Sequence, residues 1–127
     1  MRSHGGVVTT GSMAGQPLLV MITTGARTGE RRRAILTFSR DGTDYIIAGT
    51  ASGSPIEPAW LHNLRANPDV SVEAEARVFR AKAFVADEGD RDRLWDAHVA
   101  ILPHFAEYPA KAGRVIPMVR LTPAAQG

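Results

Sequence analysis

The residues best suited to chemistry in this 127-residue sequence lie in a glycine-rich loop followed by clustered arginines. Gly25 and Gly29 bracket residues 26–28 (Ala-Arg-Thr), and Arg31–Arg33 come directly after. Glycines let backbone N–H groups converge on an anion, and guanidinium groups pair with phosphate oxygens through two hydrogen bonds. The loop is therefore compatible with a phosphate site. It is equally compatible with an ordinary hairpin turn that has a solvated basic rim.

A second stretch could hold the flat part of a ligand. The turn at residues 48–53 (AGTASG) consists of small residues that allow close approach and offer hydroxyl donors, and Trp60 opens a helix shortly after it. A tryptophan alone is more typical of a core. Taken with the arginine loop, these features indicate a cleft with one end for an anion and one end for a planar ring, which is the shape of a nucleotide-like cofactor. Because no titratable catalytic group stands out, a redox cofactor that carries its own chemistry is favoured.

Other kinds of active site find little support in the sequence. The absence of cysteine excludes thiol catalysis, disulfides and Cys-ligated zinc. The serines lack a GxSxG motif. The four histidines form no HExxH pair, so we expect packing or solvated roles for them and predict no metal site.

Length and composition indicate one globular domain. An apolar share of 44% and a charged share of 22% are ordinary, and a net charge of +2 suits an anionic small molecule better than nucleic acid. The arginines also lack interleaved aromatics for stacking bases. No stretch is apolar enough for a membrane span or a secretory signal, so we expect a cytoplasmic protein, with peripheral membrane association left open.

Hydrophobic periodicity predicts the elements that position these residues. Strands are expected at residues 18–24, 33–40, 45–48, 70–74, 77–86 and 115–121, the last with Pro117 inside and therefore at an edge or bulged. Helices are expected from Pro58 to about Asn67 and from Asp90 to about Leu102, the second capped by Asp87. Asp41-Gly42 predicts a hairpin.

This order of elements predicts an α+β, mainly β fold: an antiparallel sheet closed or half-closed into a small barrel with peripheral helices. The expected domain organisation is a flexible segment at 1–16, a cofactor-binding barrel at 17–122 and a tail at 123–127.

From about residue 15 to residue 119 the chain resembles the deazaflavin-dependent nitroreductases. These are a branch of the split β-barrel flavin and deazaflavin oxidoreductases of actinobacteria. The segments that carry the resemblance are QPLLVMITTGARTGERR, the RDG hairpin, PAWLHNLRANP followed by VSVE, and RVIPMV. The resemblance implies an FMN-binding split-barrel-like fold that binds coenzyme F420. It also implies hydride transfer from the reduced cofactor to a small hydrophobic acceptor: a quinone, an enone or lactone, or a nitro compound.

The resemblance also implies site residues. Cofactor contacts are expected at Ala26, Arg27, Thr28, Arg32, Arg33, Ala34, Ile35, Ala48, Gly49, Thr50, Trp60 and Asn63. Substrate contacts are expected at Trp60, Leu102, Phe105 and Tyr108, with Tyr108 a candidate proton donor.

The sequence departs from the family pattern at some of these positions. Ala26 and Ala51 stand where basic residues are expected, which leaves Arg27 and Arg32 to hold the anionic tail of the cofactor. Among the expected substrate contacts at residues 102, 105 and 108, only Tyr108 keeps a hydroxyl group. Two alternatives stay open: a split barrel that binds FMN, and a non-catalytic barrel that carries the cofactor.

Overall fold

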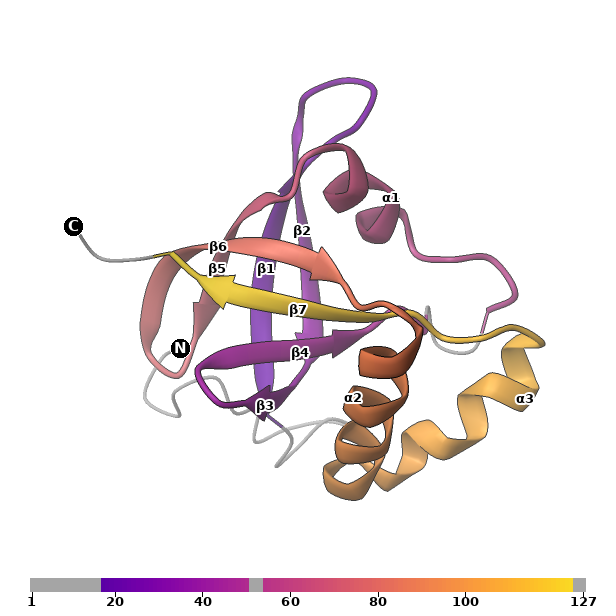
Figure 1. Cartoon of the computed structure of the whole chain (residues 1–127). Helices are drawn as coiled ribbons and strands as arrows, with labels where there is room; N and C mark the ends of the chain where they lie inside the picture. The colour runs from indigo at the N-terminus through magenta and orange to yellow at the C-terminus, as the bar shows by residue number, and fades with distance from the viewer. Residues whose placement is uncertain (1–16, 51–53, 125–127) are drawn as a thin grey trace.

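A single antiparallel sheet of seven strands forms the framework of the computed structural model, which describes residues 17–50 and 54–124. The strand order is β2-β1-β5-β6-β7-β4-β3. The bounds are β1 Leu18–Thr24, β2 Arg31–Thr37, β3 Ser39–Asp41, β4 Asp44–Ala48, β5 Asp69–Ala74, β6 Arg77–Val85 and β7 Met118–Pro123. The sheet curls so that β1 and β2 cross β4 and β7 steeply (Figure 1). The predicted split barrel is confirmed; the segment 1–16 and residues 125–127 of the tail lie outside the described residues.

The predicted strand at residues 33–40 is two strands. β2 pairs with β1, whereas β3 pairs with β4, so the chain changes partners at Phe38. The Phe38 N–H donates to the carbonyl of Pro17 (3.2 Å), and its side chain is buried. The hairpin at Asp41-Gly42 forms as predicted, with Gly42 at φ +63° in the region that glycine favours.

The prediction for the last strand is wrong in its bounds and its position. β7 starts after Pro117 and lies between β6 and β4, inside the sheet. Proline has no N–H to donate to a ladder, so the strand begins beyond it. The carbonyl of Pro117 instead accepts a hydrogen bond from the N–H of Gly49 (2.9 Å).

The helices occupy two places around the sheet. Their bounds are α1 Ala59–Ala66, α2 Glu88–Ile101, the 3-10 helix η3 Pro103–Glu107 and α3 Tyr108–Ala112. α1 lies beside the β1–β2 loop at one end of the sheet, and α2, η3 and α3 form a separate helical lobe (Figure 1). The predicted cap is confirmed, because the side chain of Asp87 accepts from the N–H of Asp90 (3.1 Å). None of the helices in the described ranges is long and apolar enough to cross a membrane.

Two hydrophobic clusters hold these parts together. The barrel interior takes in Leu61 and Leu64 of α1. The other cluster joins Ile46 and Met118 of the sheet to the helical lobe through Leu94 and Phe105. Separate hydrophobic clusters therefore anchor α1 and the helical lobe to the sheet.

His98 is buried between the lobe and the sheet. Its Nδ1 hydrogen-bonds with Ser39 Oγ (2.7 Å), and its ring packs edge-on against Phe105 at 4.7 Å between centroids. Nε2 has no hydrogen-bond partner in the described residues. Burial, with a smaller contribution from His104, lowers the pKa of His98 to about 4. The packing role expected for His98 is confirmed.

This buried imidazole makes stability depend on pH. The folded-state pKa lies below the usual histidine pKa of 6.5, so the contribution of neutral His98 is complete above pH 6.5 and is lost as the pH falls towards 4. We expect the free energy of unfolding to fall by about 2 kcal/mol between pH 6.5 and pH 5 from this group, at roughly 1.4 kcal/mol per pH unit. Urea unfolding across this range measures it. A His98→Phe variant should lose this slope, and an unchanged slope would contradict the assignment.

Candidate functional site

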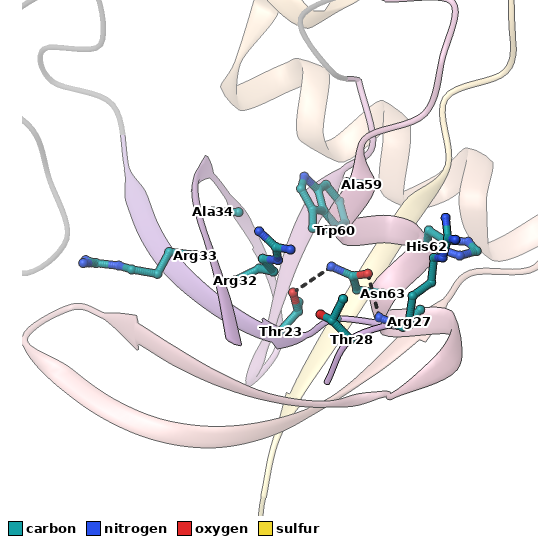
Figure 2. Close-up of a pocket in the computed structure, with 12 residues that line it drawn as sticks. Thr23, Arg27, Thr28, Arg32, Arg33, Ala34, Ala59, Trp60, His62 and Asn63 are labelled. Carbon is teal, nitrogen blue, oxygen red and sulfur yellow. Dashed lines mark hydrogen bonds between the residues drawn. The ribbon is translucent and has the colours of Figure 1, made fainter. Parts of the chain in front are cut away.

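A cleft of about 590 Å³ opens between the β1–β2 loop, β2 and α1. It brings together eight of the predicted cofactor-binding residues (Figure 2). These are Ala26, Arg27, Thr28, Arg32, Arg33, Ala34, Trp60 and Asn63. Thr23, Gly25, Ala59 and His62 complete the lining.

Asn63 holds the loop against α1. Its Oδ1 accepts from the N–H of Ala26 (3.1 Å), and its Nδ2 donates to Thr23 Oγ1 (3.5 Å). Asn67, one turn further, donates from Nδ2 to the carbonyl of Thr24 (3.5 Å). Both asparagines lie in the NLRAN stretch, which places them on the same side of α1. Asn63 thus lines the cleft and also fixes the loop that forms its floor.

Half of the six backbone N–H groups in the loop between β1 and β2 donate to acceptors within the loop. The N–H of Gly25 donates to the carbonyl of Glu30 (2.7 Å), that of Gly29 to the carbonyl of Gly25 (3.1 Å), and that of Glu30 to Thr28 Oγ1 (3.2 Å). A Cβ at Gly25 would come 3.1 Å from Thr28 Oγ1 and 3.2 Å from the carbonyl oxygen of Glu30, so a side chain there would require the loop to shift by a few tenths of an ångström. Because the Ala26 N–H donates to Asn63, few of the backbone N–H groups that were expected to converge on an anion remain available. We therefore expect the arginine side chains to supply most of the donors for an anion.

The cations of the cleft differ in how free they are. Arg32 Nη2 contacts Glu30 Oε1 at 3.2 Å, with both side chains more than half exposed. Arg27 has no carboxylate partner among the described residues, and it lies beside His62 at one end of the cleft (Figure 2). Arg33 extends away from the other labelled side chains (Figure 2). Arg27 is therefore the cation most available to an anionic ligand.

His62 was missed by reasoning from the sequence. It is exposed on α1 and reaches the cleft next to Arg27. The sequence held one signal for His62 as a site residue. This histidine directly precedes Asn63, and the other face of the helix carries the buried Leu61 and Leu64.

The remaining predicted residues do not line this cleft. Ile35 lies on β2 and is 61% exposed, whereas Ala48, Gly49 and Thr50 are buried at the end of β4. Leu102 and Phe105 are buried in the lobe core, with Tyr108 packed against them. Their assigned contacts stay predictions. Ala51, where a basic residue was expected, lies outside the described residues.

Fold and site together define a class of protein: a split β-barrel with a basic, tryptophan-lined cleft between its first hairpin and first helix. A model of the F420H(2)-dependent quinone reductase family matches residues 1–123, and the chain belongs to that family. It is an oxidoreductase, and its cofactor is coenzyme F420.

Similar proteins agree with this assignment. Over 109 residues the chain is 38% identical to the F420H(2)-dependent quinone reductase Rv1261c of Mycobacterium tuberculosis, covering 84% of this chain and 73% of that protein. A solved F420-H2 dependent reductase, FDR-A, is 31% identical with a TM-score of 0.76, covering 83% of this chain and 93% of that one. The heme storage protein HutZ of Vibrio cholerae is 18% identical with a TM-score of 0.59, and the match covers 88% of this chain and 84% of HutZ. At this identity the likeness shows a shared fold alone.

Proposed function

We propose that the protein transfers a hydride from reduced coenzyme F420 to a quinone in the cleft beside α1. The observation that carries the proposal is the position of Arg27, which has no carboxylate partner among the described residues, at one end of a cleft that also holds the half-buried indole of Trp60. The cofactor joins a phosphate and a carboxylate-bearing tail to a flat ring system. The cleft offers a cation for the anionic groups and an aromatic side chain for the ring.

The donor set of the cleft fits this cofactor. Arg27 and Arg32 would hold the phosphate and the tail, and the hydroxyl group of Thr28 offers a further contact. Trp60 would border the ring, with Asn63 keeping the loop in place. When bound, the reduced cofactor supplies the hydride. The contacts predicted at Ala34, Ile35 and residues 48–50 belong to the ring end of the same proposal.

A hydride brings two electrons and one hydrogen, so reduction of a quinone to a hydroquinone needs one further proton. Tyr108 is the proposed donor or substrate contact, because among residues 102, 105 and 108 it alone carries a hydroxyl group. In the structure its ring lies 5.1 Å from Phe105, centroid to centroid, and the residue is half-buried on the lobe. Leu102 and Phe105 would support it from the lobe core.

The acceptor class is tested by turnover. We propose a quinone as the favoured acceptor, met in the cytoplasm or at a membrane surface, with enones, lactones and nitro compounds as weaker ones. Oxidation of reduced F420 is followed by its absorbance with a naphthoquinone, a cyclohexenone and a nitroimidazole at equal concentrations. The quinone should give the highest kcat/KM. A preference for the nitro compound would reassign the acceptor, and consumption with none of the three would favour a non-catalytic carrier.

Glu30 should weaken the binding of the cofactor. Its carboxylate neutralises Arg32 at 3.2 Å, and an anion must compete with it. A Glu30→Gln variant is expected to bind F420 about two- to threefold more tightly, because an exposed ion pair contributes roughly 0.2–1 kcal/mol. Fluorescence titration measures the change. Glu57→Gln, which breaks the Glu57–Arg65 pair away from the cleft, is the matched control. Weaker binding by Glu30→Gln would show that the pair organises the loop instead.

A further inference from the structure

One guanidinium group connects the helical lobe to the segment that leads into α1. Arg114 Nε donates to the carbonyl of Ser54 (3.1 Å), and its Nη2 donates to the carbonyls of Gly49 (3.0 Å) and Thr50 (3.2 Å). These partners lie 60 to 65 residues away in sequence. The fixed fork of a guanidinium can serve several carbonyls at once, which a lysine ammonium on a flexible stem does less well.

The main chain on both sides of Arg114 is fixed to the lobe. Gly113 ends α3 at φ +67° and donates its N–H to the carbonyl of Pro109 (2.9 Å). Ala112 and Ile116 are buried in the lobe core. The side chain therefore reaches from a rigid base, and a shift of the β4–α1 connection would have to break its hydrogen bonds.

The described part of the same connection packs against the first turn of α1. Pro58, at the N-cap position, provides no side-chain cap for the helix. Gly49 lies against α1 so closely that a Cβ there would come 3.3 Å from Leu61 Cδ2. Leu61 is fully buried and follows Trp60, which lines the cleft. The hydrogen bond from Arg114 to Gly49 thus fixes backbone against which Leu61, in the first turn of α1, packs.

We propose that Arg114 is a positioning residue that fixes α1, and with it Trp60, relative to the cleft. Arg114 is not in the cleft lining, so it acts on the ligand through the helix. For the identity of the ligand, the inference rests on the proposed function. For the placement of Trp60, it does not.

Two measurements test the inference in a Trp95→Phe background, in which Trp60 is the single tryptophan of the chain. The first is acrylamide quenching of Trp60 without any ligand, and the second is fluorescence titration with F420. Arg114→Ala should raise the quenching constant about twofold and weaken F420 binding about tenfold, because a smaller fraction of molecules has the competent cleft. Guanidinium chloride at a low, non-denaturing concentration should restore both values, and the same concentration of sodium chloride should not.

The matched control is Arg91→Ala, since Arg91 Nε also donates to a lobe carbonyl, that of Ile116 (2.8 Å), without touching the β4–α1 connection. It should lower the melting temperature and leave Trp60 quenching unchanged. Arg114→Lys is measured in parallel, so that a failure of Arg114→Ala to fold does not end the test. Trp60 quenching that matches the control in both Arg114 variants would overturn the inference. Absence of F420 binding in the parent protein would instead overturn the proposed function and leave the quenching result valid.

Discussion

An Arg27→Ala variant is expected to bind coenzyme F420 about 50-fold more weakly than the unmodified protein. Arg27 has no carboxylate partner in the described part of the chain, so its charge is available to the phosphate or the tail of the cofactor. A hydrogen bond to a charged group contributes roughly 1.5–3 kcal/mol, and 50-fold corresponds to about 2.3 kcal/mol. Fluorescence titration in about 0.1 M salt gives the two dissociation constants.

The matched control for this loss of charge is Arg31→Ala. Arg31 lies on the same hairpin and is exposed, but it does not line the cleft. Its removal should change the dissociation constant by less than about threefold, because Arg31 makes no direct contact in the cleft and salt at about 0.1 M weakens the remaining attraction between exposed charges. Equal effects of the two variants would mean that the hairpin attracts the anion only through its total charge.

Replacing Arg120 with methionine should destabilise the fold by about 3 kcal/mol. Its guanidinium contacts three carboxylates, those of Asp44 (2.7 Å), Asp41 (2.8 Å) and Asp90 (3.0 Å), and its side chain is 21% exposed. The variant leaves these negative charges close together, and loss of one partner from a buried ion pair typically costs roughly 3–5 kcal/mol. The lower end applies here because the carboxylates are partly exposed and Arg93 still contacts two of them.

Urea unfolding at pH 7 measures this change. The control is Arg80→Met, an exposed arginine on β6, which should cost less than about 0.5 kcal/mol. Hydrogen bonds from Arg93 and Arg120 hold the pKa of Asp41 at about 2, below the usual aspartate pKa of 3.8. This contribution is complete above pH 3.8 and is lost as the pH falls towards 2, so the variant should match the unmodified protein most closely in acid. An equal loss at pH 7 and pH 3 would contradict the electrostatic explanation.

Local sequence signals predicted most of the fold. Alternation placed the strands to within a few residues, Asp41-Gly42 gave its hairpin and Asp87 its helix cap. The errors lie where the position of a strand depends on which other strands it pairs with. Nothing local to residues 31–41 shows that β2 and β3 bond to different strands. Pro117 led to the prediction of an edge or bulged strand, but the strand starts after this proline and lies inside the sheet.

The site was predictable in its composition more than in its contacts. Glycine, arginine and tryptophan indicated the loop and α1 as parts of the site, and the fold brings these two segments together in one cleft. The use of the backbone donors within the loop was not predictable, because Asn63 reaches Ala26 across 37 residues. The reach of Arg114 to Gly49 across 65 residues is of the same kind. Such contacts depend on the packing of the whole chain.

The most direct test of this account is a side-by-side fluorescence titration of the purified protein with coenzyme F420 and with FMN. The cleft combines Arg27, which has no carboxylate partner in the part of the chain that the structure describes, with the indole of Trp60, and the chain belongs to the F420H(2)-dependent quinone reductase family. The account predicts saturable F420 binding in the micromolar range or tighter and FMN binding at least about tenfold weaker, a difference of roughly 1.4 kcal/mol. Equal or tighter binding of FMN, or no saturation with F420, would contradict it.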